Sequence, residues 1–200
     1  GLESYIETNW TSPIQFSIGN SYGWYTITND PLYEIRLADN LYKVQSGKLL
    51  LKNFPATSHP QSVQAFTINY QPSYSLRISY TSLFASRRAI SHDVFRRSNW
   101  VKDNSPTSNS WETLYTPVWA PNQWVSNLFI SKSFQIATQN SKINLRLTSS
   151  IRNLLNTSIP SLIFEQSRYD YKNFSLQKFP PKYIYDLGRT YTIGLQLSML

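Results

Sequence analysis

The stretch TYTIGLQLSM, residues 190–199, alternates apolar and polar side chains without interruption. Its apolar residues, from Tyr191 to Met199, occupy every second position, with Thr, Gly, Gln or Ser between them. Successive side chains of a β-strand point to opposite faces, so this period predicts a strand with one apolar and one polar face. Six further segments show the same alternation, some of them weakly: residues 2–10, 14–24, 64–70, 74–80, 128–136 and 141–155. The sequence therefore predicts an all-β chain of about seven strands, each about ten residues long.

The connections between these segments alternate between short and long. Tight turns are predicted at residues 11–13, 71–73 and 138–140, whereas the other connections, at about 28–60, 86–123 and 156–188, are long. Outer-membrane β-barrels have this arrangement, because short turns join their strands on the periplasmic side and longer loops join them outside. We therefore expect an antiparallel transmembrane β-barrel segment with long extracellular loops and short periplasmic turns.

The two faces of the predicted strands fit a barrel in a membrane. Backbone N–H and C=O groups find no water to bond in lipid, so a sheet there has to close on itself. Leu, Ile and Phe side chains then face lipid, while Ser, Thr, Asn and Arg face a wet lumen. In the segment 141–155, the alternation places Arg146 and Arg152 on the lumen side.

Two other architectures remain open at this point. A soluble β-sandwich that binds carbohydrate through its aromatic residues would bury the apolar face in a dry core. The residues that distinguish the two cases are Phe16, Ile18, Leu145, Leu147, Ile193 and Leu195. A small self-contained barrel of eight strands would need residues 42–51 as a spanning strand, but three consecutive leucines at 49–51 break the alternation there. We instead expect QSGK, residues 45–48, to form the hairpin turn of a ribbon in the first long loop.

Composition narrows the class of protein further. The chain has 200 residues, of which 15% are aromatic and 15% charged, and it has no cysteine. The aromatic content excludes a disordered chain, and the lack of cysteine excludes a disulfide scaffold and a thiolate metal site. The net charge is +8, but the basic residues are spread thinly and form neither a stripe nor a known reading motif. We therefore expect no nucleic-acid partner.

No arrangement of residues predicts catalysis or metal binding. The two histidines, His59 and His92, each lie on a predicted loop without a second ligand at metal-binding spacing, and we expect both to be solvated. Glu3 and Glu7 share a face of the first predicted strand, but four residues along a strand separate them by about 13 Å, too far for the carboxylate pair of a glycosidase. The sequence thus predicts no enzyme, no metal site and no cofactor.

Ligand recognition is expected in the second long loop. Residues 86–103 carry five basic and two acidic side chains, with arginine doublets at 87–88 and 96–97, and several tryptophans follow. Arginine forks bind carboxylates or phosphates, and tryptophan faces stack on sugars or flat ligands. In a plainer interpretation, the arginines meet lipopolysaccharide phosphates and the tryptophans pack the loop against its neighbours. The candidate ligand-binding residues are Arg87, Arg88, Trp100, Trp111 and Trp119.

Several motifs resemble one family of membrane proteins. They lie in the C-terminal stretch RYDYKNFSLQKFPPKYIYDLGRTYTIGLQLS, residues 168–198, and in INLRLTSSIRNLLN, residues 143–156, which precedes it. The segments NLLN, KFPPKY and GRTY carry most of the likeness, and GKLLLKNFPATSHPQSVQAFTINYQ, residues 47–71, adds to it. Together these stretches resemble the end of TonB-dependent outer-membrane receptors, most of all the branch, common in Bacteroidota, that has a carboxypeptidase-regulatory-like N-terminal domain.

The resemblance implies a 22-stranded barrel that is plugged by an N-terminal domain and takes up ligands with energy from the TonB system. Residues 1–200 would then be the C-terminal part of this barrel, with the plug and the N-terminal strands outside the chain. The implied partners are outer-membrane lipid and lipopolysaccharide, the rest of the same receptor, the TonB system through its N-terminal part, and a surface lipoprotein. The implied location is the cell outer membrane.

Overall fold

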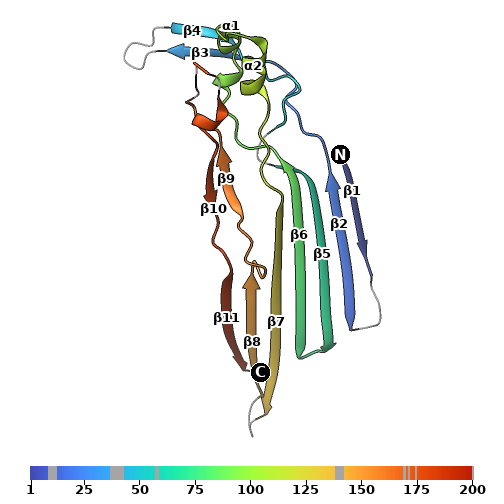
Figure 1. Cartoon of the computed structure of the whole chain (residues 1–200). Helices are drawn as coiled ribbons and strands as arrows, with labels where there is room; N and C mark the ends of the chain where they lie inside the picture. Colours follow the sequence, from blue (N-terminus) through green and yellow to red (C-terminus); the bar gives the residue numbers. More distant parts are fainter. Residues whose placement is uncertain are drawn as a thin grey trace.

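Seven strands form one antiparallel sheet whose spatial order follows the chain (Figure 1). The computed structural model describes residues 1–8, 13–36, 43–56, 59–137, 142–168, 170, 172–173 and 175–199. The strands of the sheet are β1 (Leu2–Glu7), β2 (Ile14–Tyr22), β5 (Pro60–Ser73), β6 (Leu76–Arg88), β7 (Gln123–Ala137), β8 (Lys142–Arg152) and β11 (Thr190–Met199). Their order is β1-β2-β5-β6-β7-β8-β11, so β1 and β11 are the edge strands.

Each of the seven predicted segments overlaps one of these strands, which confirms the all-β prediction. Three strands are longer than expected, since β5, β6 and β7 have 14, 13 and 15 residues. The prediction of a turn at residues 71–73 is wrong, because β5 continues to Ser73 and the chain reverses at Tyr74 and Ser75. Pro72 is accommodated because the pairing of β5 with β6 is irregular between Tyr70 and Ser73, where no ladder hydrogen bond is needed from it. Apart from Pro13, the other two predicted turns lie outside the described residues.

The long connections build two small ribbons and a few helical turns. β3 (Leu32–Arg36) pairs with β4 (Lys43–Lys48), and β9 (Pro160–Phe164) pairs with β10 (Lys182–Tyr185). The helical segments are η1 (Phe95–Arg97), α1 (Asn99–Asp103), α2 (Ser108–Tyr115) and η2 (Leu176–Lys178). All of them lie beyond the same end of the sheet (Figure 1). The chain reversal at Tyr74 and Ser75, between β5 and β6, lies at the opposite end of the sheet (Figure 1).

The ribbon expected in the first long loop exists, but its turn was misplaced. Residues 45–48 belong to strand β4, so the prediction of a turn there is wrong. Gly47 suggested a turn, whereas its role is to allow close packing: a Cβ at this position would collide with Asn99 Oδ1 and the Tyr33 ring. Because β4 pairs only with β3 and stands outside the seven-stranded sheet, residues 42–51 do not supply an eighth strand to it.

The register of the sheet gathers most of the apolar side chains of the seven strands on one face. Directly opposed residues of neighbouring strands lie on the same face. Leu195 of β11 faces Leu147 of β8, and Ile18 of β2 faces Phe66 of β5. This apolar face includes Ile6, Ile14, Phe16, Ile18, Phe66, Ile68, Tyr70, Ile78, Tyr80, Leu128, Ile130, Phe134, Leu145, Leu147, Ile151, Tyr191, Ile193, Leu195 and Leu197.

The opposite face of the sheet is mainly polar, although Val63, Leu83, Val125 and Phe129 also lie on it. Arg146 faces Ser133 on one side and Gln196 on the other, and Arg152 faces Thr190. Both arginines are therefore on the polar face, where the alternation places them. Their neighbours on this face are mainly Ser, Thr, Asn, Gln and Gly.

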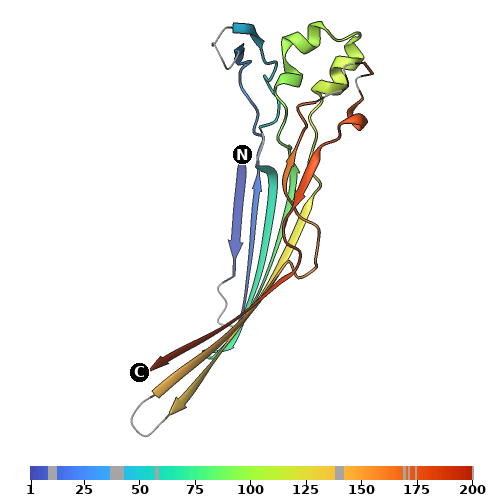
Figure 2. The same cartoon turned by 90° about the vertical axis from the view of Figure 1, so that its left-hand side faces the viewer.

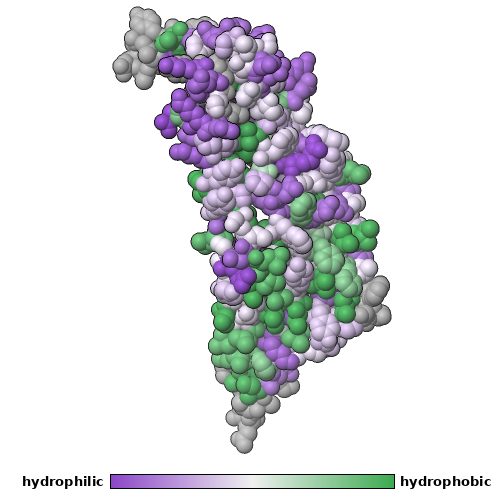
Figure 3. All heavy atoms as spheres, in the orientation of Figure 1, coloured by the Kyte–Doolittle hydropathy of each residue, from purple (hydrophilic) through white to green (hydrophobic). Residues whose placement is uncertain are grey.

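No described part of the chain covers the apolar face. The sheet is a single twisted layer (Figure 2), and hydrophobic side chains are exposed along its strands while hydrophilic ones dominate the loop end (Figure 3). Ile193 is 77% exposed and Leu195 71% exposed. The other residues that a sandwich would bury, Phe16, Ile18, Leu145 and Leu147, are also exposed or half-exposed. The chain by itself therefore forms no dry core on this side.

The buried apolar residues lie almost entirely in the loops. Within the described ranges these are Leu51, Phe54, Ala89, Ile90, Val101, Leu114, Ala120 and Ile163, together with Ala85 near the end of β6. They hold together the part of the molecule that we call the loop layer, which comprises the described residues of 23–59, 89–122 and 153–189. No helix in the described part of the chain is long and apolar enough to cross a membrane.

Candidate functional site in the loop layer

Backbone hydrogen bonds join the three segments of the loop layer. The N–H of Leu50 donates to the carbonyl of Arg97 over 2.7 Å, which joins the first segment to the second. The N–H of Ser91 donates to Ile163 O over 3.0 Å, and the N–H of Glu165 donates to Ser91 O over 2.9 Å. These two bonds join the second segment to the third. The loops are thus one assembled unit, although they are far apart in the sequence.

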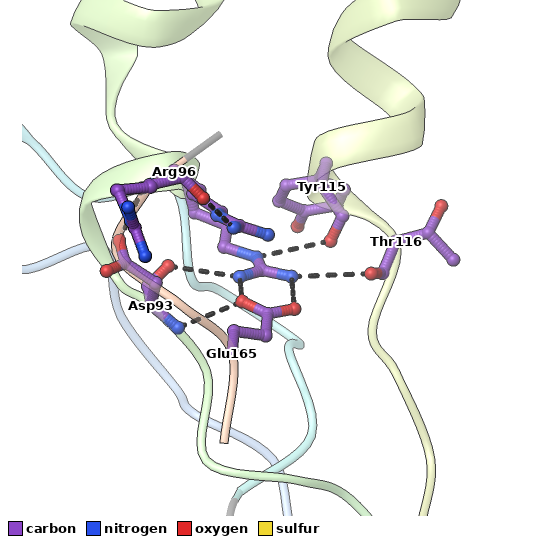
Figure 4. A network of polar contacts seen from close by, with 7 residues as sticks. Asp93, Arg96, Tyr115, Thr116 and Glu165 are labelled. Carbon is purple, nitrogen blue, oxygen red and sulfur yellow. Dashed lines mark hydrogen bonds and ion pairs between the residues drawn. The ribbon is translucent and has the colours of Figure 1, made fainter. Parts of the chain in front are cut away.

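A buried ion pair between Arg97 and Glu165 lies at the centre of this unit. The side chains are 0% and 1% exposed, and the guanidinium donates to both carboxylate oxygens, one of them over 2.7 Å. Its remaining N–H groups reach the carbonyls of Asp93 at 3.0 Å, Thr116 at 3.3 Å and Tyr115 at 3.5 Å (Figure 4). Such bidentate, fully bonded geometry is what a buried charge pair requires.

The electrostatics of this centre follow from burial and from the two charges. Burial alone would raise the pKa of the Glu165 carboxyl, but the hydrogen bonds and charge of Arg97, with the Asp93 N–H, outweigh it and hold the pKa below its usual value. Burial and, to a smaller extent, the nearby charge of Arg97 together lower the pKa of His92 to about 4. The prediction that His92 is solvated is therefore wrong: both ring nitrogens are buried, and the ring lies edge-on to Phe54 at 4.5 Å. His59 is exposed, as expected.

The second arginine doublet is structural. Arg96 and Arg97 are 2% and 0% exposed. The Arg96 side chain donates to the carbonyl of Arg168, and its backbone N–H donates to Asp93 Oδ1 over 3.1 Å. The sequence grouped these arginines with a basic ligand-binding loop, and this is wrong for the pair 96–97, since burial removes both side chains from any external ligand.

The helical part of the loop layer contains Trp100 and Trp111. Ser98 caps α1 by accepting the Val101 N–H over 3.2 Å, and Thr107 caps α2 by accepting the Ser110 N–H, also over 3.2 Å. The Trp111 ring packs beside Tyr115 at 5.2 Å and against the buried pair Val101 and Leu114. The Trp100 ring stacks on Phe95 at 5.8 Å and remains 41% exposed. Trp111 thus packs the loop against itself, whereas Trp100 also presents a surface.

Arg87 and Trp119 meet at the junction of the loop layer and the sheet. The Arg87 guanidinium lies over the Trp24 ring at 5.8 Å and over the Trp119 ring at 5.9 Å. Trp24 and Trp119 are 66% and 40% exposed, so the cluster is open to the outside. Arg88, by contrast, donates to Pro160 O over 2.9 Å and is half-buried. Of the five candidate ligand-binding residues, the structure therefore brings Arg87 and Trp119 together. Arg88 instead bonds the backbone at Pro160, and Trp100 and Trp111 belong to the helical part of the loop layer.

Some central residues were missed by sequence reasoning. Glu165 and Asp93 organise the loop layer, yet neither stood out, because Glu165 is 68 residues from its partner and carries no local motif. Trp24 was not among the candidate ligand-binding residues. A single sequence provides no signal for such long-range pairs.

The residues described here contain no group of three or more His, Asp or Glu side chains placed to hold a metal ion. Comparison of the chain with protein-family models, with curated proteins and with solved structures finds no match in any of the three.

Proposed function

We propose that the chain is part of the wall of an outer-membrane β-barrel, the C-terminal part of a TonB-dependent receptor that takes up ligands. One observation carries the proposal: a single seven-stranded sheet with an uncovered apolar face across all its strands, a polar face behind it, and every long loop at one end. In a barrel the apolar face meets lipid, the polar face lines the lumen, and the loop layer lies outside the cell.

The dimensions of the apolar face support this assignment. In β8, the apolar positions run from Ile143 to Ile151, eight steps along the strand, or about 27 Å. At a tilt of about 40°, this corresponds to a height of about 21 Å, close to the ~25 Å apolar band of outer-membrane barrels. A carbohydrate-binding sandwich has less support, because it would require another chain to cover this whole face. An eight-stranded barrel has less support because β4 stands outside the sheet.

The two edge strands define what the rest of the receptor has to supply. β1 and β11 each pair on one side only among the described strands. Unpaired backbone groups cannot remain in lipid, so further strands of the same receptor would pair with both edges and close the barrel. Arg146 and Arg152 would then face the lumen and its plug. Energy would come from the TonB system through the N-terminal part, and a surface lipoprotein is a further candidate partner at the mouth.

Cell fractionation tests the proposal. An antibody against residues 156–188 should detect a band several times heavier than 23 kDa in the outer-membrane fraction, because the barrel and plug are much larger than this chain. A band of 23 kDa in the soluble fraction would overturn the proposal.

A further inference from the structure

A groove crosses the apolar face of the sheet just below the loop layer. It has a volume of about 460 Å³ and an apolar wall formed by Ile18, Phe66, Phe84 and Trp124. The Trp124 indole is held in place because its Nε1–H donates to Ser82 Oγ over 2.7 Å. The groove thus has a fixed aromatic wall and is open on the side that faces away from the polar face.

The row of the groove nearest the loop layer is partly polar. Asn20 and Gln64 lie directly opposite each other on β2 and β5, in the same row as Phe84 and Trp124, whereas Ser82 lies one row lower with Ile18 and Phe66. The two amides lie at the loop-layer end of a face whose lower part is mainly apolar. They indicate that this level of the sheet meets groups that form hydrogen bonds, as the headgroup region of a lipid layer does.

An exposed cation stands above this polar level. Arg87 follows Phe84 by three residues, or about 10 Å along β6. Its backbone has φ = 57°, an uncommon conformation for a residue other than glycine, one residue before β6 ends at Arg88. Indole rings flank its guanidinium, and no carboxylate of the described residues lies within ion-pairing distance of it. The charge is therefore available to an external anion.

From these three features we propose that the apolar groove and Arg87 bind a phosphorylated lipid, with its phosphate at Arg87 and an acyl chain in the groove. On β2 and β5 an apolar residue (Ile18, Phe66) is followed toward the loop layer by an amide (Asn20, Gln64), and Arg87 lies beyond both amides. This is the order of acyl chain, linkage and phosphate in such a lipid. An arginine fork is complementary to phosphate, and flanking indoles suit the interface of a lipid layer. This inference rests on the proposed function, because it requires the apolar face to be in lipid.

Native mass spectrometry of the full-length protein, purified from outer membranes in detergent, tests the site. The probes are bisphosphorylated lipid A, its dephosphorylated form and inorganic phosphate. The wild type should bind the phosphorylated lipid about tenfold more tightly than the dephosphorylated one, the size expected for one charge-assisted contact. Arg87→Gln should abolish this preference, whereas Arg146→Gln, which removes the same charge from the polar face, should leave it intact.

A second variant tests the groove separately from the charge. Gln64→Trp places a bulky ring in the groove, and it should weaken binding of both lipids while the barrel remains folded, as judged by its heat-modifiable migration in gels. The proposal is overturned if Arg87→Gln retains the preference for the phosphorylated lipid, or if Gln64→Trp binds both lipids as the wild type does. It is also overturned if millimolar inorganic phosphate displaces the lipid. If the protein is folded in the outer membrane and gives any of these results, only the lipid site is refuted. If the protein is found in the soluble fraction, the proposed function is refuted.

Discussion

Replacement of Glu165 by Gln should open the loop layer and leave the sheet intact. The substitution preserves the shape of the side chain but leaves the Arg97 guanidinium, which is 0% exposed, without a counter-charge. Removing one partner of a buried ion pair costs about 3–5 kcal/mol, and we expect about 3 kcal/mol here because Gln keeps one acceptor oxygen. Since about 1.4 kcal/mol corresponds to a factor of ten, the open state of the loop layer should become more than a hundredfold more populated.

Hydrogen–deuterium exchange measures this effect directly. The informative amides are those of Ser91 and Glu165, which join the second and third segments of the loop layer. Their exchange should accelerate more than a hundredfold in Glu165→Gln, while the amides of β8 should keep their protection. Arg36→Gln is the matched control, since it breaks an ion pair with Glu34 whose side chains are 53% and 37% exposed, and it should cost less than about 1 kcal/mol.

Two results would refute this reasoning about the ion pair. The first is unchanged exchange of the loop amides in Glu165→Gln. The second is equal acceleration in the loops and in β8, which would show that the loop layer and the sheet do not open separately. The double replacement of Arg97 and Glu165 by Met should restore most of the protection, because an apolar pair removes the buried charge altogether.

The remaining predictions concern other parts of the loop layer. His92 has a pKa of about 4 in the folded loops, below its ordinary value of about 6.5, so protonation favours the open state. The stability of the loop layer should therefore be complete above about pH 6.5 and fall by about 1–3 kcal/mol as the pH drops to 4, and His92→Gln should remove this dependence in exchange measured across the range. Trp111→Ala should cost about 2 kcal/mol, because the ring packs on Val101 and Leu114, and thermal unfolding should show a larger loss than Trp100→Ala. Asn156→Ala should cost about 1–2 kcal/mol, because Asn156 Oδ1 accepts the Arg189 N–H over 2.9 Å from a backbone with φ = 53°. Asn156→Gly keeps this backbone conformation, so equal losses in both variants would assign the whole effect to the hydrogen bond.

The seven strands could be predicted from the sequence because a strand with one apolar and one polar face alternates apolar and polar residues. The alternation through Ile193, Leu195 and Leu197 is one example, and the observed register confirms it on most strands, with exceptions on β7, where Lys132 lies on the apolar face and Phe129 on the polar one. The turns were less reliable: Pro72 suggested a turn where a bulge occurs, and Gly47 suggested a turn where close packing occurs. Proline and glycine indicate a break in regular structure, but not which kind of break it is.

The loop layer could not be predicted because its interactions are long-range. Arg97 and Glu165 come from different loops, and nothing local distinguishes Arg97, which is buried, from Arg87, which is exposed. The motif NLLN illustrates the same limit. Its two asparagines, Asn153 and Asn156, both have φ = 53°, and Asn153 Oδ1 accepts the Thr157 N–H over 3.0 Å. The sequence marked this segment as characteristic, whereas the structure explains it as a turn closed by asparagine side chains.

Lipid accessibility along β11 tests the central claim most directly. The chain has no cysteine, so a single cysteine can be introduced and spin-labelled at each position from Tyr191 to Leu197 without competing sites in this segment. In native outer membranes, labels at Ile193 and Leu195 should be accessible to oxygen dissolved in lipid, and labels at Gly194 and Gln196 should be accessible to a water-soluble nickel complex. A two-residue period with this phase is the predicted result. Water accessibility at Leu195 equal to that at Gln196 would contradict the assignment of the apolar face to lipid.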